Sequence, residues 1–172
     1  EMSAKKILIA DDSPTIVGIL EYALGSMGYE VETANDGIEA IQKTYTFDPD
    51  LIVLDIEMPR MKGYQACRLL KNGEATKHIP IIMLTSLDQQ SDRFWGLTTG
   101  ADEYVIKDLE TDYLFQRIEK LLIETAGREE RHIPIEHKEM TEIDVLGWAN
   151  DLLDDALFES TIINRVGALA TK

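Results

Sequence analysis

Three aspartates, one threonine and one lysine follow short apolar runs, and side chains of these types can together perform phosphoryl chemistry. They are Asp11, Asp12, Asp55, Thr85 and Lys107. Carboxylates that meet in a cleft repel one another by several kcal/mol, and a divalent cation relieves that repulsion. Oxygen ligands without a thiolate or imidazole favour Mg²⁺, with Mn²⁺ as a substitute, over Zn²⁺.

One carboxylate of such a metal site can attack phosphorus and form an acyl phosphate. Asp55 is the candidate nucleophile, because it ends the most apolar run, residues 51–54, and is therefore expected at the centre of a sheet. The Lys107 ammonium and the Thr85 hydroxyl can then bind the phosphoryl oxygens. These residue types predict phosphorylation of an aspartate.

A parallel sheet must bring these residues together, and the pattern of the chain predicts one. Apolar runs of four to six residues alternate with segments of helical period, as in βα units. The carboxyl ends of such strands gather functional groups where the strand order reverses. We therefore expect an α/β, doubly wound (βα)5 fold with an additional C-terminal helix. The expected strands are 6–10, 30–34, 51–54, 79–84 and 103–106, and the expected helices are 14–27, 36–45, 63–71, 89–98 and 111–125.

The composition excludes several classes of protein. The chain has 172 residues, of which 44% are hydrophobic and 28% charged, as in globular domains. With 32 acidic and 17 basic residues its net charge is −15, which argues against nucleic acid or an anionic membrane as a direct partner. The single cysteine, Cys67, allows no internal disulfide, and no apolar run is long enough to span a membrane. We expect a soluble, cytoplasmic protein.

Three motifs resemble those of response-regulator receiver domains. They are ILIADD at 7–12, LDIEMPRMKG at 54–63 and GADEYVIK at 100–107, and they agree with the family in order and spacing over about residues 5–125. The resemblance implies a flavodoxin-like fold that takes a phosphoryl group on Asp55 from a histidine kinase or phosphotransfer protein. It also implies that the chain catalyses only its own phosphorylation and dephosphorylation.

The resemblance further assigns roles around Asp55. Mg²⁺ would be ligated by Asp12, Asp55 and the main-chain carbonyl of Glu57, and Asp11 would hold it through water. Thr85 and Tyr104 would form the switch pair, in which the Thr85 hydroxyl moves toward the phosphoryl group and the Tyr104 ring fills the vacated space. The face of the fourth helix, fifth strand and fifth helix would then serve as a dimer or partner surface.

Two positions depart from the family pattern. Asp108 follows Lys107 where proline is usual, and a cis peptide costs about 2.5–4 kcal/mol without proline, so the geometry of this loop stays open. Glu57 places a further carboxylate at the mouth of the site, where it can strengthen cation binding or hinder an anionic phosphodonor. We expect Glu57 to alter the lifetime of the phosphoryl group.

The chain beyond the receiver pattern divides into a linker, 126–140, and an amphipathic helix, 141–172. Thr141 and Asp144 have the spacing of a capping box. Apolar residues then recur in seven-residue rows, which are Ala149, Ala156, Ile163 and Ala170, and Val145, Leu152 and Val166. The rows favour a coiled coil or bundle and a homodimer, while the alternative is a tail folded back on its receiver. Glu1 before Met2 and the end at Lys172 indicate a piece of a longer chain.

Two other functions stay open at this point. A phosphatase of the haloacid-dehalogenase type also uses an aspartate nucleophile with Mg²⁺, but it requires a second aspartate where this chain has Glu57. Turnover of a phosphomonoester would indicate such an enzyme. A scaffold that dimerises without phosphorylation would keep the fold, and its mass would not change with beryllofluoride and Mg²⁺.

Overall fold

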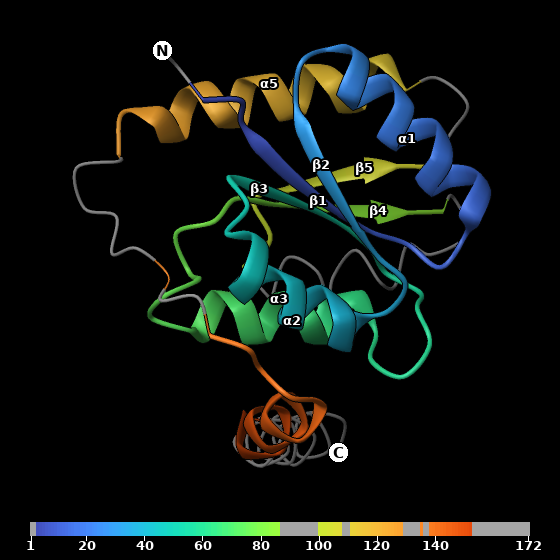
Figure 1. Cartoon of the computed structure of the whole chain (residues 1–172). Helices are drawn as coiled ribbons and strands as arrows, with labels where there is room; N and C mark the ends of the chain where they lie inside the picture. The colour runs from blue at the N-terminus through green and yellow to red at the C-terminus, as the bar shows by residue number, and fades with distance from the viewer. Residues whose placement is uncertain (1–2, 87–99, 108–110, 129–134, 136–137, 153–172) are drawn as a thin grey trace, which may run out of the picture.

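A single five-stranded parallel sheet in the order β2-β1-β3-β4-β5 organises the chain, with helices on both faces (Figure 1). The computed structural model describes residues 3–86, 100–107, 111–128, 135 and 138–152. The strands are β1 (Lys6–Ala10), β2 (Glu30–Ala34), β3 (Leu51–Asp55), β4 (Ile81–Thr85) and β5 (Glu103–Ile106). The helices that cover the sheet are α1 (Pro14–Ser26), α2 (Gly37–Phe47), α3 (Gly63–Asn72) and α5 (Asp112–Ala126). The predicted flavodoxin-like fold is confirmed.

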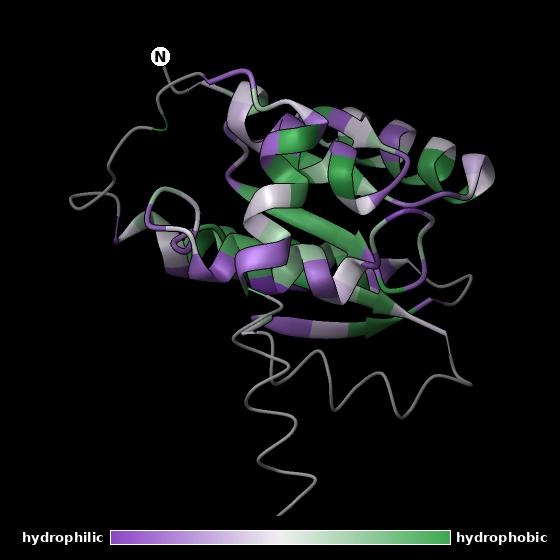
Figure 2. Cartoon of the chain, turned by 90° about the horizontal axis from the view of Figure 1, so that it is seen from below, coloured by the Kyte–Doolittle hydropathy of each residue, from purple (hydrophilic) through white to green (hydrophobic). Residues whose placement is uncertain are grey.

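Alternate residues of the strands fill two separate cores. Leu8 and Ala10 point to the side covered by α2 and α3, whereas Ile7 and Ile9 point to the side covered by α1 and α5. The central strands are hydrophobic along their length, and the helices alternate hydrophobic and hydrophilic residues (Figure 2). The sheet is therefore buried on both faces, as parallel sheets require.

The strand order reverses between β1 and β3, and this reversal fixes where the acidic residues meet. Ala10 of β1 lies in register with Leu54 of β3, so Asp11 and Asp55 each follow a paired position. Asp55 is in turn paired with Leu84 of β4, next to Thr85. The reversal thus creates the crevice at the carboxyl edge in which doubly wound folds bind their ligands.

Strands β3 and β4 each extend one residue beyond the prediction, to Asp55 and Thr85, and the start of β4 also differs. The fourth strand was expected to begin at Ile79, but β4 begins at Ile81. Pro80 has no N–H to donate to the ladder, although its carbonyl accepts a hydrogen bond from the Ile52 N–H at 3.0 Å. The predicted helix at 89–98 and the loop after Lys107 lie outside the described residues.

Residues 142–152 form a further helix that lies against α2 and α3 (Figure 1). Its predicted capping box is present, because the Asp144 N–H donates to Thr141 Oγ1 at 3.1 Å and the Thr141 N–H donates to Asp144 Oδ2 at 2.9 Å. This part of the tail is folded back on the receiver, and residues 153–172 lie outside the described part of the chain. Within the residues that the structure describes, each helix is too short or too polar to cross a bilayer.

Gly63 allows α3 to start against the end of β3. A Cβ atom at Gly63 would lie 1.8 Å from the carbonyl oxygen of Asp55. We expect Gly63→Ala to lower the free energy of unfolding by about 3 kcal/mol or more, because the two backbones would have to separate. Gly18→Ala is the control, since no atom lies within 4 Å of the added Cβ in the middle of α1. Urea unfolding should show it stabilised by about 0.5–1 kcal/mol, and equal stability of the two variants would contradict this account.

Candidate functional site

Three carboxylates converge at the carboxyl edge of the sheet. One oxygen from each of Asp11, Asp12 and Asp55 lies within 4.8 Å of the others. Asp11 is fully buried, Asp55 is 5% exposed, and Asp12 is exposed to solvent. Asp11 also accepts a hydrogen bond from the Ser13 N–H at 2.9 Å, which fixes its carboxylate at the start of α1. The cluster therefore opens to solvent on the side of Asp12.

Lys107 supplies the positive charge of the site. Its Nζ lies 2.6 Å from Asp11 Oδ2 and 3.1 Å from Asp55 Oδ2. The Lys107 N–H donates to the Thr85 carbonyl at 2.6 Å, so the end of β4 positions the lysine. Burial opposes the Lys107 charge, but the hydrogen bond to Asp11 and the charges of both aspartates outweigh it, and the pKa of Lys107 is raised.

The electrostatics of the cluster are unbalanced, with three carboxylates facing one ammonium. Burial and the neighbouring charge of Asp11 raise the pKa of Asp55 to about 6, although Lys107 opposes this shift. A cation held by all three carboxylates would supply the missing charge. The donor set consists of oxygen only, which fits Mg²⁺ or Mn²⁺ and disfavours Zn²⁺.

The remaining predicted residues lie around this cluster in different environments. Thr85 is buried, and its hydroxyl donates to the Ser86 carbonyl at 3.1 Å. Tyr104 is half-buried and packs against the core beneath α2 and α3. The Glu57 side chain is exposed and pairs with Lys62 Nζ at 3.6 Å. The structure thus brings Lys107 into contact with Asp11 and Asp55, places Asp12 beside them, and leaves the Glu57 carboxylate exposed.

Sequence reasoning missed the role of the loop between β3 and α3. Arg60 adopts a positive φ of 63° in this loop, and its guanidinium pairs with Asp36 Oδ2 at 2.9 Å. Asp36 also caps α2 by accepting a hydrogen bond from the Glu39 N–H. The Gly37 N–H donates to the Met61 carbonyl at 3.1 Å, which holds the same loop. No spacing pattern links Arg60 to Asp36, so only the fold reveals this pair.

Comparisons with known proteins agree with this geometry. Residues 7–119 match the family model described as Response regulator receiver domain. The chain is 46% identical over 127 residues to ycf27 of Cyanophora paradoxa, covering 74% of this chain and 52% of the relative. It is 42% identical over 118 residues to the alkaline phosphatase synthesis transcriptional regulatory protein PhoP of Bacillus subtilis, covering 69% of this chain and 48% of the relative. The chain thus spans about half the length of these curated relatives.

A solved structure shows the same arrangement of the chain. The response regulator protein TrrA of Thermotoga maritima, crystallised in complex with Mg²⁺ and BeF, superimposes on this chain with a TM-score of 0.62 at 36% identity. The similarity covers 68% of this chain and 98% of the solved one. The matched part is therefore a complete unit in that protein.

The raised pKa of Asp55 makes stability depend on pH. The native state binds the Asp55 proton up to about pH 6, above the ordinary aspartate value of 3.8, so stability without metal falls as the pH rises through this window. At pH 7.5 in EDTA we expect Asp55→Asn to raise the free energy of unfolding by about 2 kcal/mol, and at pH 4 the gain should be small.

Urea unfolding at the two pH values measures this effect. Asp151→Asn is the matched control, because Asp151 is exposed on the helix of residues 142–152 and far from the cluster in the sequence. An Asp55→Asn protein no more stable than the parent at pH 7.5 would show that the carboxylates are not under electrostatic strain.

Proposed function

The chain belongs to the response-regulator receiver family, and from this premise we propose that Asp55 accepts a phosphoryl group from a histidine kinase or phosphotransfer protein in a Mg²⁺-dependent reaction. The observation that carries the proposal is the position of Lys107 Nζ, 2.6 Å from Asp11 and 3.1 Å from Asp55. Receiver domains act as phosphoacceptor signalling domains, and their partner is a histidine kinase. The family match favours this reading over the phosphatase alternative.

The proposed reaction uses the chain's own side chains in distinct roles. An Asp55 oxygen attacks the phosphorus, the bond from phosphorus to the donor breaks, and the leaving donor keeps the electron pair. Lys107 holds the second carboxylate oxygen and stabilises negative charge on the phosphoryl group. Asp12, Asp55 and the Glu57 carbonyl would ligate Mg²⁺, with Asp11 holding it through water, and the cation supplies further charge neutralisation when bound.

A switch from Thr85 and Tyr104 is part of the proposal. The Thr85 hydroxyl exchanges its bond to the Ser86 carbonyl for one to a phosphoryl oxygen. Tyr104 lies on β5 in register with Met83, two residues before Thr85 on β4, so the Tyr104 and Thr85 side chains project from the same face of the sheet. Rotation of Tyr104 would then reshape the face that includes β5 and α5.

Self-association and location complete the proposal. The seven-residue rows of the tail, when they are not packed on α2 and α3, and the face with β5 and α5 both support a homodimer. The net charge of −15 supports a protein partner in preference to nucleic acid or membrane. The expected partner kinase uses ATP, which supports a location of this chain in the cytoplasm.

Phosphorylation of Asp55 can be tested with acetyl phosphate. We expect intact mass spectrometry to show one added phosphoryl group with Mg²⁺ and none with EDTA or in Asp55→Asn. Lys107→Ala should slow the reaction at least about tenfold, because the phosphoryl charge loses its fixed partner. Lys77→Ala is the control, since Lys77 is exposed, pairs with Glu74 and precedes β4 at the opposite edge of the sheet. Modification of the Asp55→Asn protein at the same rate would refute the assignment.

The charge of Glu57 should affect the entry of an anionic donor. We expect Glu57→Gln to speed phosphorylation by acetyl phosphate about threefold at low salt, because an exposed carboxylate at the mouth of the site repels the donor. The gain should disappear at high ionic strength, where exposed charges are screened. Stopped-flow measurements with Glu124→Gln, an exposed change on α5, provide the comparison. A gain that persists in high salt would point to a local effect on the bound ligands.

A further inference from the structure

The helix of residues 142–152 covers α2 and α3 with the residues that begin its seven-residue rows. Val145 is fully buried and Ala149 is 9% exposed, and both belong to the core beneath α2 and α3. Leu152 packs against the same core. The outer face of the helix is solvated, with Ile143 81% exposed. The apolar face of the helix is therefore already occupied by its own receiver.

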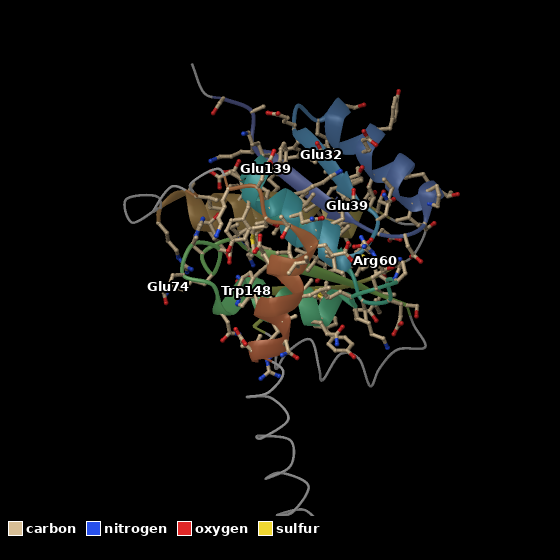
Figure 3. All side chains as sticks on the ribbon, turned by 60° about the horizontal axis from the view of Figure 1, so that its bottom comes forward. Glu32, Glu39, Arg60, Glu74, Glu139 and Trp148 are labelled. Atoms are coloured by element: carbon tan, nitrogen blue, oxygen red, sulfur yellow. The ribbon has the colours of Figure 1, made fainter. Side chains whose placement is uncertain are left out.

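Trp148 is seated between α2 and the end of α3 (Figure 3). Its ring meets the Tyr45 ring edge to face, with centroids 6.4 Å apart and an interplanar angle of 77°. The far edge of the indole lies over Gly73, where an added Cβ would be 3.0 Å from the ring. Because residue 73 is a glycine, the indole of Trp148 can approach the receiver this closely.

Polar contacts fix the start of the same helix. Arg60 Nη1 lies 2.9 Å from Glu142 Oε1 while the same guanidinium pairs with Asp36. Gln42 Nε2 donates to the Met140 carbonyl at 3.1 Å. Arg60 stands in the loop that follows Asp55, next to the tail helix in Figure 3. These contacts hold the helix in one register on α2 and α3.

The same apolar row cannot be buried in two places at once. Val145, Ala149 and Leu152 start the rows that continue as Ala156 and Val166 in the sequence. Rows of this spacing pair helices from two chains. We propose that the face of α2 and α3 is a docking surface for the chain's own helix, and that release from this surface frees the row to pair with a second copy of this chain. Docking and pairing through 145–152 exclude each other.

The test releases the helix by substitutions on the receiver side of the contact or on the helix side. No Mg²⁺ or phosphodonor is added, so its outcome is separate from that of the proposed phosphorylation. Trp95→Phe leaves Trp148 as the single tryptophan. Tyr45→Ala with Arg60→Ala removes receiver contacts and keeps the row intact, whereas Val145→Asp damages the row itself. Ile143→Asp is the matched control on the exposed face of the same helix.

Sedimentation equilibrium and Trp148 emission give the result. The parent and the Ile143→Asp protein should be monomers with a shielded, blue-shifted Trp148. The Tyr45→Ala/Arg60→Ala protein should dimerise at least about tenfold more tightly than the parent, with red-shifted emission at dilutions where it is monomeric. The Val145→Asp protein should stay monomeric with red-shifted emission. Circular dichroism monitors folding. If the double variant unfolds, Glu142→Arg, which breaks the contact with Arg60, should shift the mass in the same direction.

Three outcomes would overturn the proposal. A solvent-exposed Trp148 in the parent would show that the helix is not docked. A receiver-side variant that releases Trp148 but stays monomeric would show that the freed row does not pair. Dimerisation of the Val145→Asp protein as tight as that of the receiver-side variant would place the pairing on another face.

Discussion

The crowding of three carboxylates around one half-buried ammonium is the interaction on which the function of this molecule depends. Lys107 contacts Asp11 and Asp55, yet the pKa of Asp55 is still raised to about 6 because burial and Asp11 outweigh the lysine. A polypeptide tolerates such repulsion only where the rest of the fold overdetermines the geometry. The repulsion among the carboxylates favours binding of a cation and then phosphorylation of Asp55, since both change the charge that faces Lys107.

The fold imposes this crowding through backbone positions far from the charges themselves. The reversal of strand order sets Asp11 beside Asp55, and the hydrogen bond from the Lys107 N–H to Thr85 aligns the end of β5 with that of β4. Gly63 lets α3 begin directly against the Asp55 carbonyl. The central strands β3 and β4 are buried along their whole length, so the free energy that holds the carboxylates together comes from the apolar core.

Local patterns in the sequence were sufficient to predict the sheet and the acidic cluster. The continuous apolar run before Asp55 identified a central strand, and the alternating run at 30–34 identified the edge strand β2. The cluster followed because the carboxyl ends of parallel strands share one edge. Pro80 shortened β4, and the residues 89–98 and 153–172 lie outside the described chain. The pairing of Arg60 with Asp36 and Glu142 had no local signal, since it joins three separate segments.

A crystal structure of the chain with Mg²⁺ and beryllofluoride would test the central claim most directly. The account predicts beryllium bonded to an Asp55 oxygen, Mg²⁺ among Asp11, Asp12 and Asp55, and fluorine atoms in contact with Lys107 Nζ and Thr85 Oγ1. Beryllofluoride on another carboxylate, or a Lys107 side chain turned away from a bound group on Asp55, would contradict it.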